Sequence, residues 1–114
     1  MTAELIDGKA FAAALRGRIA TAVAAADAGA RVLLAVRDRN RGAAVAQTLR
    51  GGLSEHAVVE VDLADLDSIC RGAASVTEPV DILVNNAGVS SPTLQHTADG
   101  FEMQFGTNHL GHFA

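Results

Sequence analysis

Among its 114 residues the sequence has one cysteine, no tryptophan and no tyrosine. A single cysteine, Cys70, excludes an internal disulfide framework and fits a reducing compartment. Cys70 occupies an apolar position of a predicted helix, so we expect it to lie in the core rather than to act as a nucleophile. The absence of tyrosine removes one class of proton donor from any site that the chain forms.

Basic residues are also scarce, since 9 Lys and Arg stand against 13 Asp and Glu, giving a net charge of −4. A basic surface for nucleic acid is therefore not expected. The most apolar stretch, Ile19–Val36, is interrupted by Asp27 and Arg31 and is shorter than the roughly 20 apolar residues of a membrane span. The N-terminus carries Glu4 and Asp7 before any positive charge, unlike a signal peptide. We expect a cytoplasmic chain with no membrane span.

The residues that are present predict alternating strands and helices. The composition, 49% hydrophobic and 19% charged, is that of one globular domain. Continuous apolar runs predict strands over 32–36, 57–61 and 80–84, with a weaker candidate at 3–6. Helical composition and periodicity cover 9–28, 40–50, 65–75 and 99–113. Such alternation with short connections predicts a parallel sheet with helices on both faces.

A family resemblance begins where the third apolar strand ends in Asn85-Asn86-Ala87-Gly88. This pattern resembles the short-chain dehydrogenase/reductase family. Residues 29–38 resemble that family's second strand, and Val61-Asp62-Leu63 resembles the end of its third. Residues 97–113 are similar to its retinol-dehydrogenase-like branch. The resemblance covers residues 20–114 and implies the N-terminal portion of a doubly wound, Rossmann-like parallel sheet, truncated to three or four strands.

The resemblance also predicts the domain organisation of the chain. Residues 1–114 are expected to form a single incomplete dinucleotide-binding domain, with an atypical segment over 1–28. Ligands of open parallel sheets bind beyond the carboxyl ends of the strands. The residues expected to bind the cofactor there are Arg37, Asp62, Leu63, Asn85, Asn86, Ala87 and Gly88.

Individual roles follow from chemistry and resemblance together. Arg37 is placed to pair with a ribose 2′-phosphate, which favours NADP, although NAD is possible; the alternative is a solvated arginine. Asp62 either faces the adenine or caps a helix. Gly88 would allow the backbone to approach the cofactor closely. Asn108 resembles the family's active-site asparagine, whose backbone holds a water in a proton relay. His109 and His112 lack the further ligands of a zinc site, so no metal is expected.

Two features depart from the family. Its glycine-rich turn, Thr-Gly-x-x-x-Gly-x-Gly, should fall near 11–18, where only Gly17 is a glycine. The turn binds the pyrophosphate, and an alanine-rich helix cannot replace it. The catalytic Ser and the Tyr-x-x-x-Lys motif also have no counterpart, since tyrosine is absent and Lys9 is the only lysine. Residues 5–15 instead resemble the start of the methylenetetrahydrofolate dehydrogenase/cyclohydrolase family.

The function expected from this pattern is that of a fragment of an NADP(H)-dependent oxidoreductase, inactive as it stands. Its partners would be the dinucleotide and, in an active form, a small lipophilic alcohol or carbonyl compound. Self-association through unpaired apolar edges is also expected. The alternatives are a non-catalytic binding or interaction module, a decayed reading frame, and a folate-linked dehydrogenase suggested by residues 5–15.

Overall fold

The computed structural model describes residues 22–114, apart from the side chain of Leu53. Residues 22–27 are helical, and the helix ends at Gly29, whose φ of 89° is a left-handed conformation. The amide of Ala30 bonds the carbonyl of Ala25 at 2.9 Å, which closes the helix as a glycine cap does. The rest of the helix predicted over 9–28 lies outside the described residues. So does the candidate strand 3–6, which the sequence alone predicts between strands at Val32 and Ile82.

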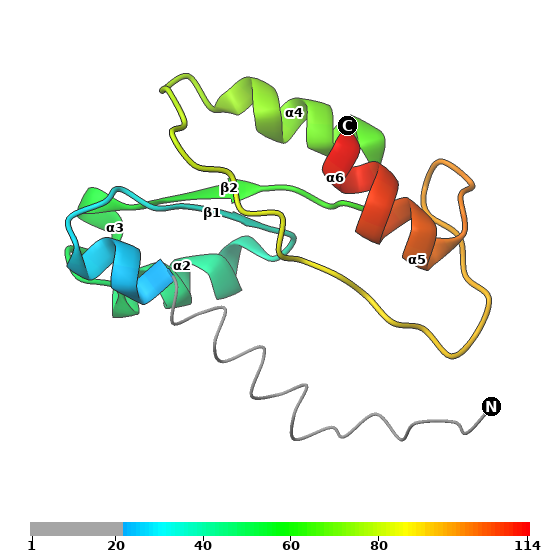
Figure 1. The fold of residues 1–114 in the computed structure, drawn as a ribbon, viewed down its shortest axis with the longest axis horizontal. Coiled ribbons are helices and arrows are strands. Elements are labelled where there is room, and N and C mark those ends of the chain that lie inside the picture. The colour runs from blue at the N-terminus through cyan, green and yellow to red at the C-terminus, as the bar shows by residue number, and fades with distance from the viewer. Residues whose placement is uncertain (1–21) are drawn as a thin grey trace.

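Two predicted strands and their parallel pairing are confirmed. Strand β1 (Leu33–Val36) pairs with β2 (Ala57–Glu60) in the register Leu33↔Ala57 to Val36↔Glu60. Figure 1 shows the two strands side by side, with their carboxyl ends pointing the same way. The expectation of three or four strands is not met within residues 22–114, where the sheet has two.

The helices cover the sheet in layers. Helices α2 (Arg39–Thr48) and α3 (Gly52–Glu55) lie on one side, and α4 (Leu66–Ser75) lies on the other (Figure 1). Helices on both faces of a parallel pair confirm the predicted α/β class. The short helix α3 was not predicted.

Local capping signals explain where the two longer helices begin. Asp38 accepts a hydrogen bond from the Arg41 amide at 3.0 Å, and Asp65 accepts one from the Ser68 amide at 3.1 Å. These carboxylates satisfy amides that the helix ladder leaves free.

Glycines set how closely these helices approach the sheet. A Cβ on Gly42 of α2 would lie 2.5 Å from Val36 Cγ2 and 2.8 Å from Val58 Cγ1. A Cβ on Gly72 of α4 would overlap Val61 and lie 3.0 Å from the carbonyl oxygen of Glu60. Both helices therefore rest on the strands at positions where a side chain would push them away.

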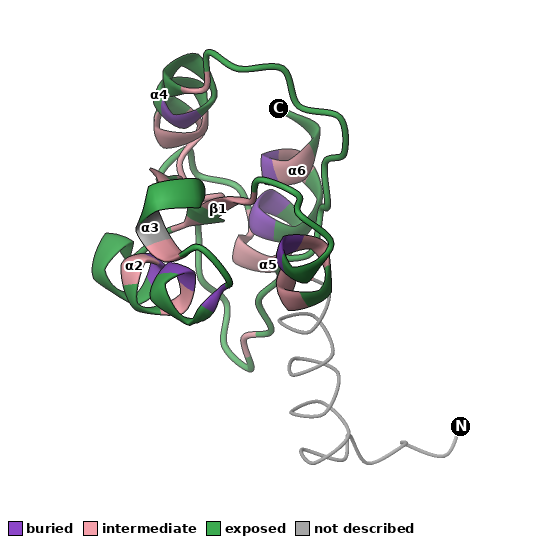
Figure 2. Cartoon of the chain, turned by 90° about the vertical axis from the view of Figure 1, so that its left-hand side faces the viewer, coloured by how far each residue is buried: buried purple, intermediate pink, exposed green. Residues whose placement is uncertain are grey.

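The predicted strand Val80–Val84 is wrong for this structure, because the segment is irregular. A strand exists only where its backbone pairs with a neighbour, and no ladder to 80–84 is formed by residues 22–114. Ile82, Leu83 and Val84 are accordingly exposed, at 81%, 78% and 64%. Figure 2 shows most of the connection that follows α4 in the colour of exposed residues.

The expected burial of Cys70 is also wrong, since this cysteine is exposed. Gly72 is the α4 residue that lies against the sheet. A position two residues earlier points about 200° away from it around an α-helix. Cys70 therefore lies on the side of α4 that faces away from the sheet, although its position in the sequence pattern is apolar. The buried apolar side chains among the described residues are instead Ala26, Ala46 and Leu49.

The C-terminal helix begins later than predicted and changes its winding. It runs through α5 (Met103–Phe105), the π-helical turn η1 (Gly106–Leu110) and α6 (Gly111–Phe113). The predicted start at residue 99 is displaced because the Phe101 amide bonds the side chain of Thr97 at 3.2 Å, in a turn that precedes the helix. No helix between residues 22 and 114 combines the length and the hydropathy that a membrane crossing requires.

Candidate functional site

The carboxyl ends of both strands meet at one edge of the sheet. The Val61 amide donates to the Val36 carbonyl at 2.9 Å, so the residues after β1 and β2 start from adjacent points. Arg37 follows β1 at this edge and is exposed. Within residues 22–114 its side chain has no hydrogen-bond or ion-pair partner. The neighbouring carboxylate of Asp38 is occupied by the α2 cap. The arrangement leaves a guanidinium free to bind an anion at this edge.

Asp62 shapes the loop after β2 and does not cap the following helix. Its carboxylate accepts from the Ala64 amide at 2.9 Å, and its own amide donates to Ser68 Oγ at 3.0 Å. The cap of α4 is Asp65. The helix-cap role predicted as one alternative for Asp62 therefore belongs to Asp65. The other alternative, a contact of Asp62 with the adenine, stays a prediction.

Asn108 lies on the π-helical turn, and its side chain forms two hydrogen bonds with the backbone of Val89, the residue after Gly88. Its Oδ1 accepts from the Val89 amide at 2.7 Å, and its Nδ2 donates to the Val89 carbonyl at 2.8 Å. A Cβ on Gly88 would lie 3.4 Å from Asn108 Oδ1, so this glycine keeps the approach tight. π-Helical turns are rare and often occur at functional sites. The structure therefore places Asn108 beside Gly88, two predicted site residues that lie about 20 positions apart in the sequence.

The last helical turn touches both loops of the predicted cofactor site. A Cβ on Gly111 would overlap the backbone oxygen of Leu63 and lie 3.0 Å from its Cβ. The next residue, His112, bonds the Ala87 carbonyl through Nε2 at 2.8 Å. The loop after β2 and the segment 85–88 thus meet on one helix, near the carboxyl ends of the strands in Figure 1.

A shallow cavity of about 280 Å³ lies where this helix meets the segment 85–88. Its lining consists of Asn85, Asn108, His109, His112 and Phe113. Residues 85–88 are exposed. The site is therefore an open surface rather than a closed pocket.

The two histidines of the helix have separate partners. His109 stacks on Phe105 with ring centroids 5.4 Å apart, whereas His112 bonds the Ala87 carbonyl. Within residues 22–114 no group of three or more potential ligands could hold a metal ion.

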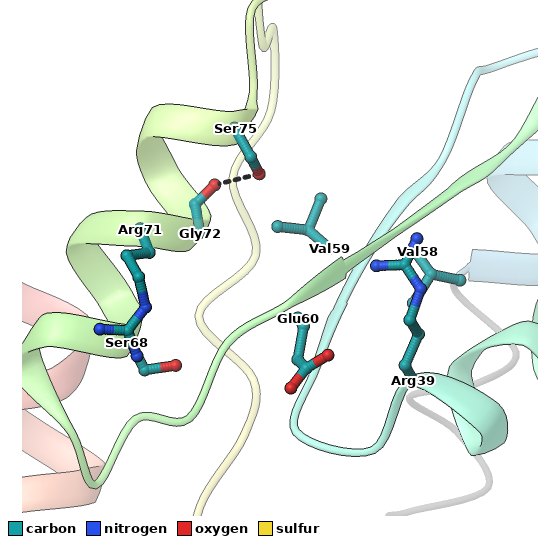
Figure 3. Close-up of a pocket in the computed structure, with 8 residues that line it drawn as sticks. All are labelled: Arg39, Val58, Val59, Glu60, Ser68, Arg71, Gly72 and Ser75. Atoms are coloured by element: carbon teal, nitrogen blue, oxygen red, sulfur yellow. Dashed lines mark hydrogen bonds between the residues drawn. The ribbon is translucent and has the colours of Figure 1, made fainter.

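A second hollow, also about 280 Å³, lies away from this site along the outer edge of β2 (Figure 3). It is lined by Arg39, Val58, Val59, Glu60, Ser68, Arg71, Gly72 and Ser75. Charged side chains beside an open strand edge hinder pairing with other chains. The hollow is best explained as the charged flank of this edge, and none of the predicted site residues lies in it.

The hydrogen bond between His112 and the Ala87 carbonyl was not predicted from the sequence. The useful signal was the spacing of four residues between Asn108 and His112, which places both side chains on one face of a helix.

Glu102 anchors the helix that carries these residues, and its pKa is lowered. The cause is the two hydrogen bonds that its carboxylate accepts, from the amides of Gln104 at 2.9 Å and Phe105 at 2.8 Å. Because folding lowers the pKa of Glu102, its ionised carboxylate contributes to folding stability in full above the usual glutamate pKa of 4.5. This contribution is lost as the pH falls through the lowered pKa of Glu102 in the folded chain.

We expect the ¹⁵N shifts of the Gln104 and Phe105 amides to titrate with a midpoint below pH 4.5, the usual glutamate value. Glu102→Gln should abolish this titration, because the amide side chain carries no titrating proton. The matched control Glu60→Gln, at the far edge of β2, should leave it intact. A midpoint at or above 4.5 in the unmodified chain would contradict the assignment.

Comparison with known proteins adds a family match. The model of the short chain dehydrogenase family matches residues 17–114. Retinol dehydrogenase 13 of Homo sapiens is 48% identical over 98 residues, which cover 82% of this chain and 30% of the relative. The chloroplastic protochlorophyllide reductase of Pisum sativum is 40% identical over 102 residues, covering 83% and 26%.

A solved structure agrees with these matches. The crystal structure of an uncharacterized protein from Mycobacterium paratuberculosis superposes with a TM-score of 0.75 at 47% identity. The match covers 83% of this chain and 34% of that one. The chain thus spans about a third or less of the length of the proteins that it resembles.

Proposed function

The chain belongs to the short-chain dehydrogenase family, and we propose that it is the NADP(H)-binding part of an oxidoreductase acting on an alcohol or a carbonyl compound. One observation supports this most: Gly111 and His112, on one helical turn, contact the Leu63 loop and the Ala87 segment together. The residues expected to bind the cofactor come from separate stretches of sequence, and these contacts hold two of those stretches close to each other.

The preference for NADP rests on Arg37. A 2′-phosphate is a dianion at neutral pH, and a guanidinium binds it through parallel, charge-assisted hydrogen bonds. Arg37 is exposed and unpartnered within residues 22–114, and the carboxylate beside it is held in the α2 cap. This leaves Arg37 available for the ribose phosphate, with Asp62 and Leu63 on the adenine side.

The segment Asn85–Gly88 would cover the nicotinamide half of the cofactor. When bound, NADP(H) would supply the hydride chemistry, and the protein would bind and orient it. The expected affinity is low, because the sequence has no glycine-rich turn to hold the pyrophosphate. The names of the relatives, retinol dehydrogenase and protochlorophyllide reductase, favour a lipophilic alcohol or carbonyl compound as the substrate class.

Titration calorimetry with NADPH and with NADH tests this proposal on the purified chain. We expect weak, saturable binding of NADPH, with a dissociation constant on the order of 0.1–1 mM, and weaker binding of NADH. The expected difference reflects one charged contact to the 2′-phosphate. Heats that do not saturate for either nucleotide, or tighter binding of NADH, would overturn the proposal.

A further inference from the structure

We infer that His112 is a positioning residue that fixes the peptide between Ala87 and Gly88 for the cofactor. The inference rests on the proposed function, because it assigns a task within the same dinucleotide site. Its basis is the 2.8 Å contact between His112 Nε2 and the Ala87 carbonyl. His112 is half-buried, whereas the segment that it contacts is exposed.

The chemistry of the contact fixes the protonation of the ring. A carbonyl oxygen only accepts hydrogen bonds, so Nε2 must carry the hydrogen. Neutral His112 is thus the Nε2–H tautomer, and its Nδ1 has no partner within residues 22–114. This tautomer is a measurable signature of the contact.

Asn108 and His112 together hold both ends of a short backbone stretch. Asn108 bonds the amide and the carbonyl of Val89, and His112 bonds the carbonyl of Ala87. Between these anchors lies Gly88, which can adopt many backbone conformations if it is not restrained. Two anchors on successive turns of one helix therefore limit the stretch to one path.

The alternative is that His112 only fills space on the helix. Its neighbour Gly111 already seats the helix on Leu63 through a close backbone contact. Removing the hydrogen bond while keeping a similar side-chain volume separates the two roles. His112→Leu removes the donor, and His112→Gln keeps an N–H donor at comparable reach.

The first test needs no cofactor. A long-range ¹H–¹⁵N correlation spectrum of the intact chain at mildly alkaline pH should show the Nε2–H tautomer for His112, assigned by its loss in His112→Gln. In His112→Leu the Gly88 ¹⁵N shift should move, because the carbonyl of the same peptide loses its donor. The matched control His96→Leu, at an exposed histidine in the preceding loop, should leave the shift unchanged. The Nδ1–H tautomer at His112 would overturn the inference without any variant.

The second test measures NADPH affinity by titration calorimetry. We expect about a 10-fold weaker affinity in His112→Leu, as for the loss of one hydrogen bond, and a value within about 3-fold of the unmodified chain in His112→Gln. Equal losses in both variants, or none in His112→Leu, would overturn the positioning role. If the unmodified chain binds no NADPH, the proposed function fails, and the tautomer and the Gly88 shift still decide whether His112 fixes this peptide.

Discussion

Arg37→Ala is expected to weaken NADPH binding by about 10- to 100-fold and to change NADH binding by less than about 2-fold. Hydrogen bonds to charged groups contribute about 1.5–3 kcal/mol, and each 1.4 kcal/mol is a factor of ten in affinity. Arg37 is expected to contact only the 2′-phosphate, which NADH lacks. Titration calorimetry of the variant against both nucleotides measures the effect.

Two further variants sharpen this result. Arg37→Lys keeps the charge but loses the planar pair of donors, so it should bind NADPH with an intermediate affinity. Arg50→Ala removes an exposed arginine beyond the other end of α2 and should leave both affinities unchanged. If Arg37→Ala weakens NADPH and NADH equally, Arg37 supports the fold or the whole dinucleotide and does not select the phosphate.

The chain by itself is expected to show no turnover of alcohols, aldehydes or ketones. Hydride transfer to a carbonyl leaves an alkoxide, which needs a proton as it forms. Members of the family that the sequence resembles supply this proton from a tyrosine beside a lysine, and this chain has no tyrosine and only Lys9. Loss of positioned acid catalysis costs about 10²–10⁴-fold, and misplacement of the cofactor costs about another 10²-fold.

The histidines of the C-terminal helix do not replace the missing acid. His112 already donates to the Ala87 carbonyl, and His109 stacks on Phe105. The assay follows NADPH consumption with aldehydes, ketones and retinoids, beside an Asn108→Ala variant. Turnover by the unmodified chain that disappears in Asn108→Ala would show a working active site and refute the expectation.

Local sequence signals determined the parts of the fold that depend on neighbouring residues. Apolar runs predicted β1 and β2, and the aspartates Asp38 and Asp65 stand where carboxylates cap α2 and α4. Gly29, directly after the helix predicted over 9–28, ends that helix in a left-handed conformation. Each of these features depends on backbone propensity or on a hydrogen bond within a few residues. They can therefore be read from a short window of sequence.

The tertiary structure decided what depends on partners far along the chain. Val80–Val84 has strand-like composition, yet no neighbour pairs with it within residues 22–114, because composition alone does not provide a ladder partner. Whether Cys70 is buried depends on which face of α4 meets the sheet. Gly72 lies on that face, so Cys70 is exposed.

The candidate site divides in the same way. The motif at 85–88 and Asn108 were found from the order of residues, whereas the hydrogen bonds that hold the C-terminal helix to this segment and to Val89 were not. Asn108 reaches Val89 across 19 positions, and His112 reaches Ala87 across 25. Sequence determined the chemical groups of this site, and packing of the helix on the loops determined their partners, because a side-chain hydrogen bond forms only where the fold brings donor and acceptor within about 3 Å.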